Sequence, residues 1–168
     1  MRSLIMLAFA LVLPAQAEAQ ALAETPAARL TSVTAGFGNS MGWLGLQGER
    51  YLRSDRFSVF GGIGYVPASD PGDSSGAAFA GGIRAFTGGT RHRGFLEFSV
   101  SQLTTHLACF EECHDHYGPG VQAGYQYVSR RGLTALASVG VGYAPGIPDG
   151  ETKVGGIGGL GLGYTWRR

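Results

Sequence analysis

The sequence predicts an all-β protein, an eight-stranded antiparallel up-and-down transmembrane β-barrel. Three observations point to this fold class. Segments of about ten residues alternate between apolar and small or polar residues, which places apolar side chains on one face of each strand. Turn signals separate these segments at regular intervals. Glycine accounts for 29 of the 168 residues, well above the usual ~7%, and this excess suits a narrow barrel with a tightly filled lumen.

The first residues are predicted to be a secretory signal peptide. Arg2 precedes a short apolar stretch, Leu4 to Leu13, and small-residue cleavage patterns follow at Ala15-Gln16-Ala17 and Ala17-Glu18-Ala19. This stretch is too short for a membrane-spanning helix. The expected organisation is a signal peptide over 1–19, a short linker over 20–29 and a barrel domain over 30–168.

Eight strands are predicted after the linker, and glycine in nearly every one argues against helices. In the third, Phe57, Val59 and Ile63 share one face. In a soluble barrel such faces would turn inward and leave glycine and serine as the outer surface. We therefore expect them to face lipid, around a lumen of glycine and polar residues. The predicted strands are 30–38, 42–52, 57–66, 76–86, 94–106, 117–128, 133–143 and 153–166.

A recurring phrase, Gly-x-Gly-Tyr, closes several strands. It stands at Gly62-Ile63-Gly64-Tyr65, Gly140-Val141-Gly142-Tyr143 and Gly161-Leu162-Gly163-Tyr164. Aromatic side chains at strand ends are typical of the girdles that flank the apolar band of a membrane barrel. The predicted girdles place Tyr65 and Tyr143 at the outer rim and Tyr125, Tyr127, Tyr164 and Trp166 at the periplasmic rim.

The connections between strands alternate in length, as in outer-membrane barrels with short periplasmic turns and longer outer loops. Tight turns are expected at 53–56, 87–93 and 129–131, and longer loops at 67–75, 107–116 and 144–152. The first connection, near Asn39-Ser40, is short but belongs to the long-loop side by its position.

The sign of the charge differs between the short turns and the long loops. The short-turn side carries Arg53, Arg56, Arg91, Arg93, Arg130, Arg131, Arg167 and Arg168, and the long loops carry Asp70, Asp73, Glu111, Glu112, Asp115, Asp149 and Glu151.

The chain resembles the small eight-stranded outer-membrane barrels of Gram-negative bacteria, the superfamily that contains the OmpA membrane domain and OmpX-like proteins. The resemblance rests on the Gly-x-Gly-Tyr strand ends, the stretch Gly120 to Tyr125 and the last strand, Gly161 to Trp166. It implies an outer-membrane location, contact with membrane lipid and lipopolysaccharide, and insertion by the barrel-assembly machinery.

Charged residues at inward positions predict a network in the lumen. Glu49, Arg84 and Glu97 lie on the face opposite the apolar residues, and ionised groups in a narrow lumen must pair. We therefore expect Arg84 to bridge one or both glutamates, with Gln122 and Gln126 extending the network. A structural plug is favoured over a gated or proton-conducting lumen, and eight strands leave no room for a solute pore.

The third long loop carries the remaining reactive side chains. Cys109 and Cys113 are expected to form a disulfide, because an exported pair this close oxidises readily. His114 and His116 would share one face of an extended segment and are candidate ligands for Zn²⁺ or Cu²⁺. His-x-His in a solvated loop commonly binds nothing, so no metal or other cofactor is expected.

A non-enzymatic envelope protein is the favoured function, with a structural role or surface interactions through the long loops. One alternative is a lipid A-modifying enzyme, which would need a serine and a histidine close together on a strand face. His106 is followed by Leu107 and Ala108, and Ser101 lies about 16 Å away along a strand. Another alternative is a soluble secreted barrel that binds a hydrophobic ligand. A net charge of +1 gives no indication of a nucleic-acid partner, and a monomer is expected.

Overall fold

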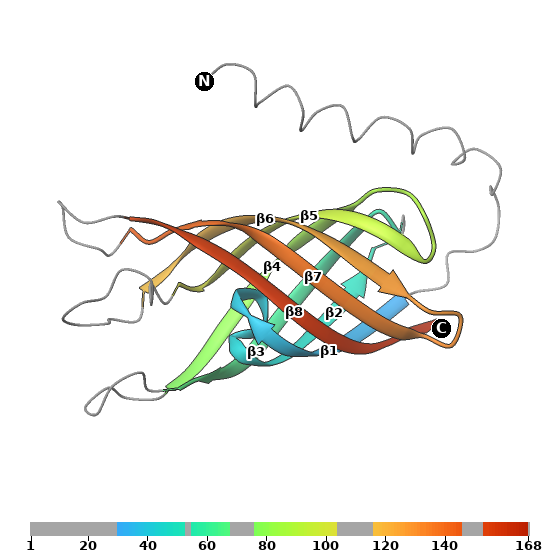
Figure 1. Ribbon diagram of the computed structural model, residues 1–168, viewed down its shortest axis with the longest axis horizontal. Coiled ribbons are helices and arrows are strands. Elements are labelled where there is room, and N and C mark those ends of the chain that lie inside the picture. Colours follow the sequence, from blue (N-terminus) through green and yellow to red (C-terminus); the bar gives the residue numbers. More distant parts are fainter. Residues whose placement is uncertain (1–29, 53–54, 68–75, 104–115, 146–152, 168) are drawn as a thin grey trace, which may run out of the picture.

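The computed structural model describes residues 30–52, 55–67, 76–103, 116–145 and 153–167, which form one closed sheet (Figure 1). Each strand pairs antiparallel with the next along the chain, and β8 pairs with β1. The elements are β1 (Leu30–Gly38), η2 (Asn39–Met41), β2 (Trp43–Tyr51), β3 (Phe57–Val66), β4 (Gly76–Phe86), β5 (His92–Leu103), β6 (His116–Val128), β7 (Leu133–Tyr143) and β8 (Val154–Arg167). The predicted all-β, eight-stranded antiparallel barrel is confirmed within these ranges.

The apolar face of every strand points away from the barrel axis. Ile63, Val141 and Leu162 are 53%, 56% and 72% exposed, whereas the inward-facing Glu97 and Gln122 are fully buried. Period-two alternation along each strand produces this separation. The result is the reverse of a soluble protein, in which large apolar side chains are inside and charged ones outside. No helix among the described residues is long and apolar enough to cross a membrane.

The end of β8 and the turn between β6 and β7 lie at the same end of the barrel (Figure 1). Gly132 closes this turn with φ 91°, its amide donating to the Ser129 carbonyl at 3.0 Å. The Gly132 carbonyl also accepts from the Thr165 amide at 2.8 Å, which fixes the turn against β8. A Cβ at position 132 would lie 2.7 Å from the Thr165 carbonyl oxygen, so glycine is required there.

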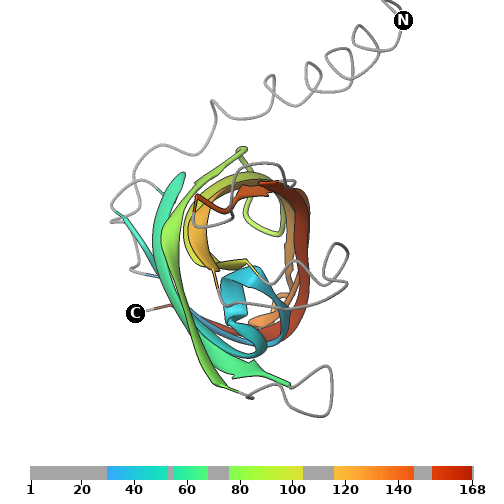
Figure 2. The ribbon, with the colours of Figure 1, turned by 90° about the vertical axis from the view of Figure 1, so that its left-hand side faces the viewer.

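The first connection folds into the lumen, where sequence reasoning placed only a short outer turn. Figure 2, viewed along the barrel from the end opposite the β6–β7 turn, shows η2 inside the ring of strands. Ser40 and Met41 are completely buried. Asn39 holds the segment in place: its Nδ2 donates to the Gln102 carbonyl at 3.1 Å, and its Oδ1 accepts from the Gly158 amide at 3.3 Å. The η2 segment therefore forms a plug inside the lumen, and Figure 2 shows it from the end opposite the β6–β7 turn.

Glycine on the neighbouring strand makes room for this plug. A Cβ added at Gly62 of β3 would lie 2.2 Å from the Ser40 carbonyl oxygen, and one added at Gly64 would lie 2.3 Å from the Gly42 carbonyl oxygen. These distances are far below van der Waals contact. The inward glycines of the Gly-x-Gly-Tyr phrase at residues 62–65 thus face the backbone of η2, while Tyr65 faces outward.

Aromatic side chains fill more of the lumen than the sequence predicted. Phe60, Phe86 and Phe95 point inward and are 5–7% exposed. Phe86 and Phe95 pack with Met41, Tyr51 and Leu136 in one buried cluster, and Phe86 contacts the Phe95 ring at 5.8 Å between centroids. The expectation of a lumen made of glycine and polar groups is therefore incomplete, because large rings pack between the charged side chains.

Candidate functional site

The centre of the lumen holds an ion-paired triad from three strands. Arg84 of β4 lies directly opposite Glu97 of β5 in the sheet register, and its Nη2 is 2.7 Å from Glu97 Oε2. Arg84 Nη1 lies 3.4 Å from Oε1 of Glu49, on β2. All three side chains are buried, so Arg84 is held between two carboxylates out of contact with solvent.

Glutamines extend the triad around the barrel wall. Gln122 Nε2 donates to Glu97 Oε1 at 2.8 Å, and Gln122 Oε1 accepts from the Ser138 hydroxyl at 3.0 Å. Gln126 Nε2 donates to Glu49 Oε2 at 3.4 Å. The structure thus brings together all five side chains that the sequence analysis placed in the lumen.

A second buried arginine, Arg93, joins the network from β5. Sequence reasoning assigned it to a turn, which is wrong, because β5 begins at His92 and Arg93 points inward with 2% exposure. Its Nη2 donates to the Tyr51 hydroxyl at 3.0 Å and to Gln126 Oε1 at 2.8 Å. The Tyr51 hydroxyl also lies 3.1 Å from Glu49 Oε2, so Tyr51 links Arg93 to the triad.

Each buried guanidinium lies against two aromatic rings. Arg84 Cζ lies 4.5 Å from the Phe60 ring centroid and 4.8 Å from that of Phe95. Arg93 Cζ lies 4.7 Å from the ring centroids of both Tyr51 and Phe86. Stacking on aromatic faces stabilises a desolvated guanidinium by roughly 2 kcal/mol. The inward rings therefore form part of the charge network as well as filling space.

Strand parity was the signal that could have found the missed residues. Arg93 and Phe95 have the same parity as Glu97 on β5, and all three side chains are buried. The run Arg91-His92-Arg93-Gly94 is polar and contains glycine, so its composition resembles a turn. Composition outweighed parity at the strand boundary, which is where sequence-based assignments are least certain.

The predicted girdle residues all lie on the outer face, at both ends of the barrel. Tyr65 and Tyr143 end β3 and β7 at one end, and the other four lie near the β6–β7 turn. At that end the Tyr164 and Trp166 rings are 5.1 Å apart. His92 contacts the Tyr125 hydroxyl through Nδ1 and the Tyr127 ring at 4.9 Å, so this histidine belongs to the outer face rather than to the lumen. Exposed fractions of the six are 38–49%, for Tyr65, Tyr125, Tyr127, Tyr143, Tyr164 and Trp166.

The candidate residues of the third long loop fall outside the described part of the chain. Cys109, Cys113 and His114 belong to this segment, and of His116 only the backbone, at the start of β6, is described. The disulfide therefore remains a prediction. Within the described ranges no three His, Cys, Asp or Glu side chains gather as metal ligands would.

Comparison with protein-family models, with curated proteins and with solved structures found no match.

Proposed function

We propose that this protein is an integral outer-membrane β-barrel with a filled lumen and a non-enzymatic role in the bacterial envelope. The observation that carries the proposal is the inside-out distribution of side chains. Large apolar residues on every strand are half-exposed on the outer wall, while two arginines and two glutamates are buried in the lumen. Soluble monomers rarely expose contiguous apolar patches larger than about 300–600 Å².

A lipid environment accounts for both halves of this distribution. Each outward apolar side chain gains roughly 1 kcal/mol or more on leaving water. The backbone groups of a closed sheet are all paired, which is what the hydrocarbon region requires. Closure of β8 onto β1 also leaves no sheet edge for pairing with another chain, which supports a monomer.

The lumen argues against the soluble ligand-binding alternative. A barrel that carried a hydrophobic ligand would need an apolar cavity, whereas ion pairs, glutamines and η2 occupy this one. The same filling supports a structural or surface-interaction role over solute transport. In this proposal the long connections face outward toward lipopolysaccharide and surface ligands, and the barrel-assembly machinery inserts the chain.

The proposal is tested by placing arginine on the outer wall. Val139 is 71% exposed at the middle of β7. Val139→Arg should reduce recovery of folded protein in the outer-membrane fraction, because arginine at the bilayer midplane costs about 2–4 kcal/mol. Asp55→Arg, in an exposed turn, is the matched control and should leave recovery unchanged.

Two readouts decide the outcome. The unmodified protein should fractionate with the outer membrane and migrate faster on a detergent gel before heating than after it. Recovery of the protein in a freely soluble fraction, or equal recovery of both variants, would overturn the proposal. Lipid A mass spectra from cells with and without the gene should be identical; a missing acyl or phosphate group would favour the lipid A-modifying enzyme instead.

A further inference from the structure

A basic recess lies where the β6–β7 turn meets the end of β8. Its volume is about 270 Å³. Arg93, Arg130 and Arg131 line it together with Ser129, and Trp166 and Tyr164 form its outer side. No carboxylate is among its lining residues, so the described wall of the recess carries three positive charges and no negative one. We call this the arginine pocket.

Arg93 lacks a direct counter-charge there. It is 2% exposed, and among the described residues it forms no ion pair, whereas Arg84 is paired with both Glu49 and Glu97. In the part of the chain that the structure describes, the Nε of Arg93 has no hydrogen-bond partner, and neither does the buried hydroxyl oxygen of Ser129. Buried charges and buried polar atoms are normally satisfied. An anionic ligand with several acceptor oxygens would satisfy both groups.

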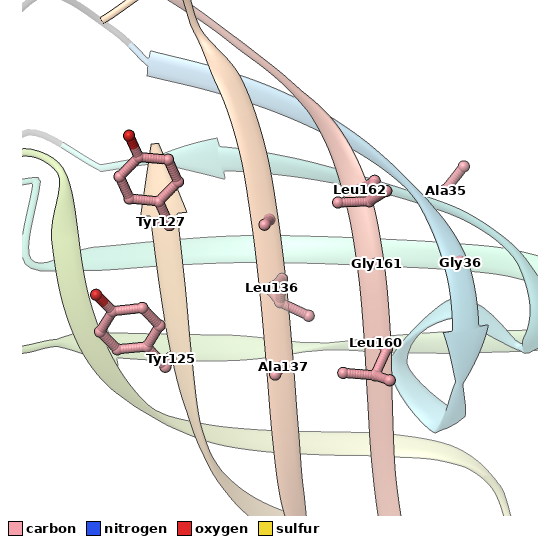
Figure 3. Close-up of a pocket in the computed structure, with 10 residues that line it drawn as sticks. Ala35, Gly36, Tyr125, Tyr127, Leu136, Ala137, Leu160, Gly161 and Leu162 are labelled. Atoms are coloured by element: carbon pink, nitrogen blue, oxygen red, sulfur yellow. The ribbon is translucent and has the colours of Figure 1, made fainter. Parts of the chain in front are cut away.

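A second recess lies on the outer wall of the same strands. Figure 3 shows Tyr125 and Tyr127 of β6 on one side of it and Leu160 and Leu162 of β8 on the other. The small side chains of β7, including Ala137, form its floor. Its volume is about 560 Å³, within the range of about 300–1,000 Å³ typical of ligand sites. We call this the apolar groove.

The two recesses follow one another along the strands. On β8, Leu162 of the apolar groove lies two positions from Tyr164 of the arginine pocket. On β7, Ala137 is five residues beyond Gly132, which corresponds to about 16 Å of strand. Basic and apolar surfaces at this separation match an amphiphile with a charged head and an extended hydrocarbon chain.

We propose that the β6–β8 wall binds one phospholipid with an anionic headgroup, its phosphate in the arginine pocket and an acyl chain in the apolar groove. The inference rests on the proposed membrane location. Guanidinium groups bind phosphate oxygens through paired N–H donors. Tyr164 and Trp166 stand at the level between head and chain, where amphipathic rings are favoured at a membrane surface. Three arginines select against a headgroup that carries an amine.

The test uses native mass spectrometry of the purified full-length barrel in detergent, titrated separately with dimyristoyl phosphatidylglycerol and dimyristoyl phosphatidylethanolamine. Phosphatidylglycerol should bind roughly tenfold more tightly, the difference expected from one charge-assisted hydrogen bond. The double variant Arg130→Gln, Arg131→Gln should lose this preference. Arg56→Gln, an exposed arginine in another short turn, should keep it.

The groove is tested independently of the charge. Ala137→Leu fills the floor and should weaken binding of both lipids several-fold, whereas Ala77→Leu, an exposed outward alanine on β4, should weaken neither. Glycerol phosphate, which lacks acyl chains, should bind at least tenfold more weakly than phosphatidylglycerol.

Equal binding of the two phospholipids, or equal binding of glycerol phosphate, would overturn the inference. Outer-membrane fractionation and heat-dependent gel mobility are measured on the same preparations. If the protein fractionates with the outer membrane and shows heat-dependent mobility but binds both lipids equally, only the proposed lipid site is wrong. If it shows neither property, the proposed membrane location is wrong.

Discussion

Removing Arg84 should destabilise the barrel more than any other single change in the central triad. Arg84→Met leaves Glu49 and Glu97 buried without their cation, which lies 3.4 Å and 2.7 Å from them. Breaking a buried ion pair from one side costs about 3–5 kcal/mol. Loss of the contacts with the two flanking phenylalanine rings adds to this, since each desolvated cation–π contact contributes roughly 1–2 kcal/mol.

A second change on β5 should partly reverse this loss. Glu97→Gln removes one of the two stranded charges, and Glu49 keeps its contacts with the Ser58 hydroxyl at 2.5 Å and the Tyr51 hydroxyl at 3.1 Å. The double variant Arg84→Met, Glu97→Gln should therefore be more stable than Arg84→Met alone. The control is Ser101→Ala on β5, whose buried hydroxyl has no hydrogen-bond partner among the described residues, and it should change stability by less than about 0.5 kcal/mol.

The assay is urea unfolding of the refolded barrel in detergent micelles, followed by circular dichroism and by the loss of the fast-migrating gel band. An Arg84→Met variant within about 1 kcal/mol of the unmodified protein would refute the argument that the triad is electrostatically coupled. A double variant less stable than Arg84→Met would refute it as well, because removing an unpaired buried carboxylate should raise the stability.

Two further predictions concern the plug and the third long loop. Gly62→Ala places a Cβ 2.2 Å from the Ser40 carbonyl oxygen, so the same urea assay should show a loss of about 1–3 kcal/mol in the free energy of unfolding. Gly48→Ala is the control and should be neutral, because a Cβ there has nothing within 4 Å among the described residues. Equal effects of the two variants would show that the plug does not contact β3. Cys109 and Cys113 should react with maleimide only after reduction, and labelling of the untreated protein would show free thiols.

Alternation along each strand allowed the barrel and its central triad to be predicted. Arg84 and Glu97 follow the parity opposite to the apolar face, so their inward direction required only the strand assignment. In the closed lumen the two residues lie directly opposite each other on β4 and β5. Their pairing follows from local pattern plus closure, which is why it was accessible from sequence alone.

The η2 plug depends on information that alternation does not contain. Whether a short connection folds over the rim or into the lumen is decided by space, and that space comes from Gly62 and Gly64 on a different strand. The inward position of Arg93 depends on where β5 begins. Once β5 is extended to His92, strand parity places Arg93 inward, whereas the plug does not follow from the residues adjacent to it in the chain.

The position of η2 has a consequence for the order of assembly. Asn39 binds the backbones of both β5 and β8, so the β1–β2 hairpin is not fully hydrogen-bonded until the last strand arrives. The pairing between β1 and β8 joins the two ends of the barrel sequence, so its closure entropy is high and we expect it to form late in folding. We therefore expect η2 to take its final position when β8 pairs with β1. In a chain whose β1–β2 hairpin is misplaced, we expect folding to fail only when β8 pairs with β1.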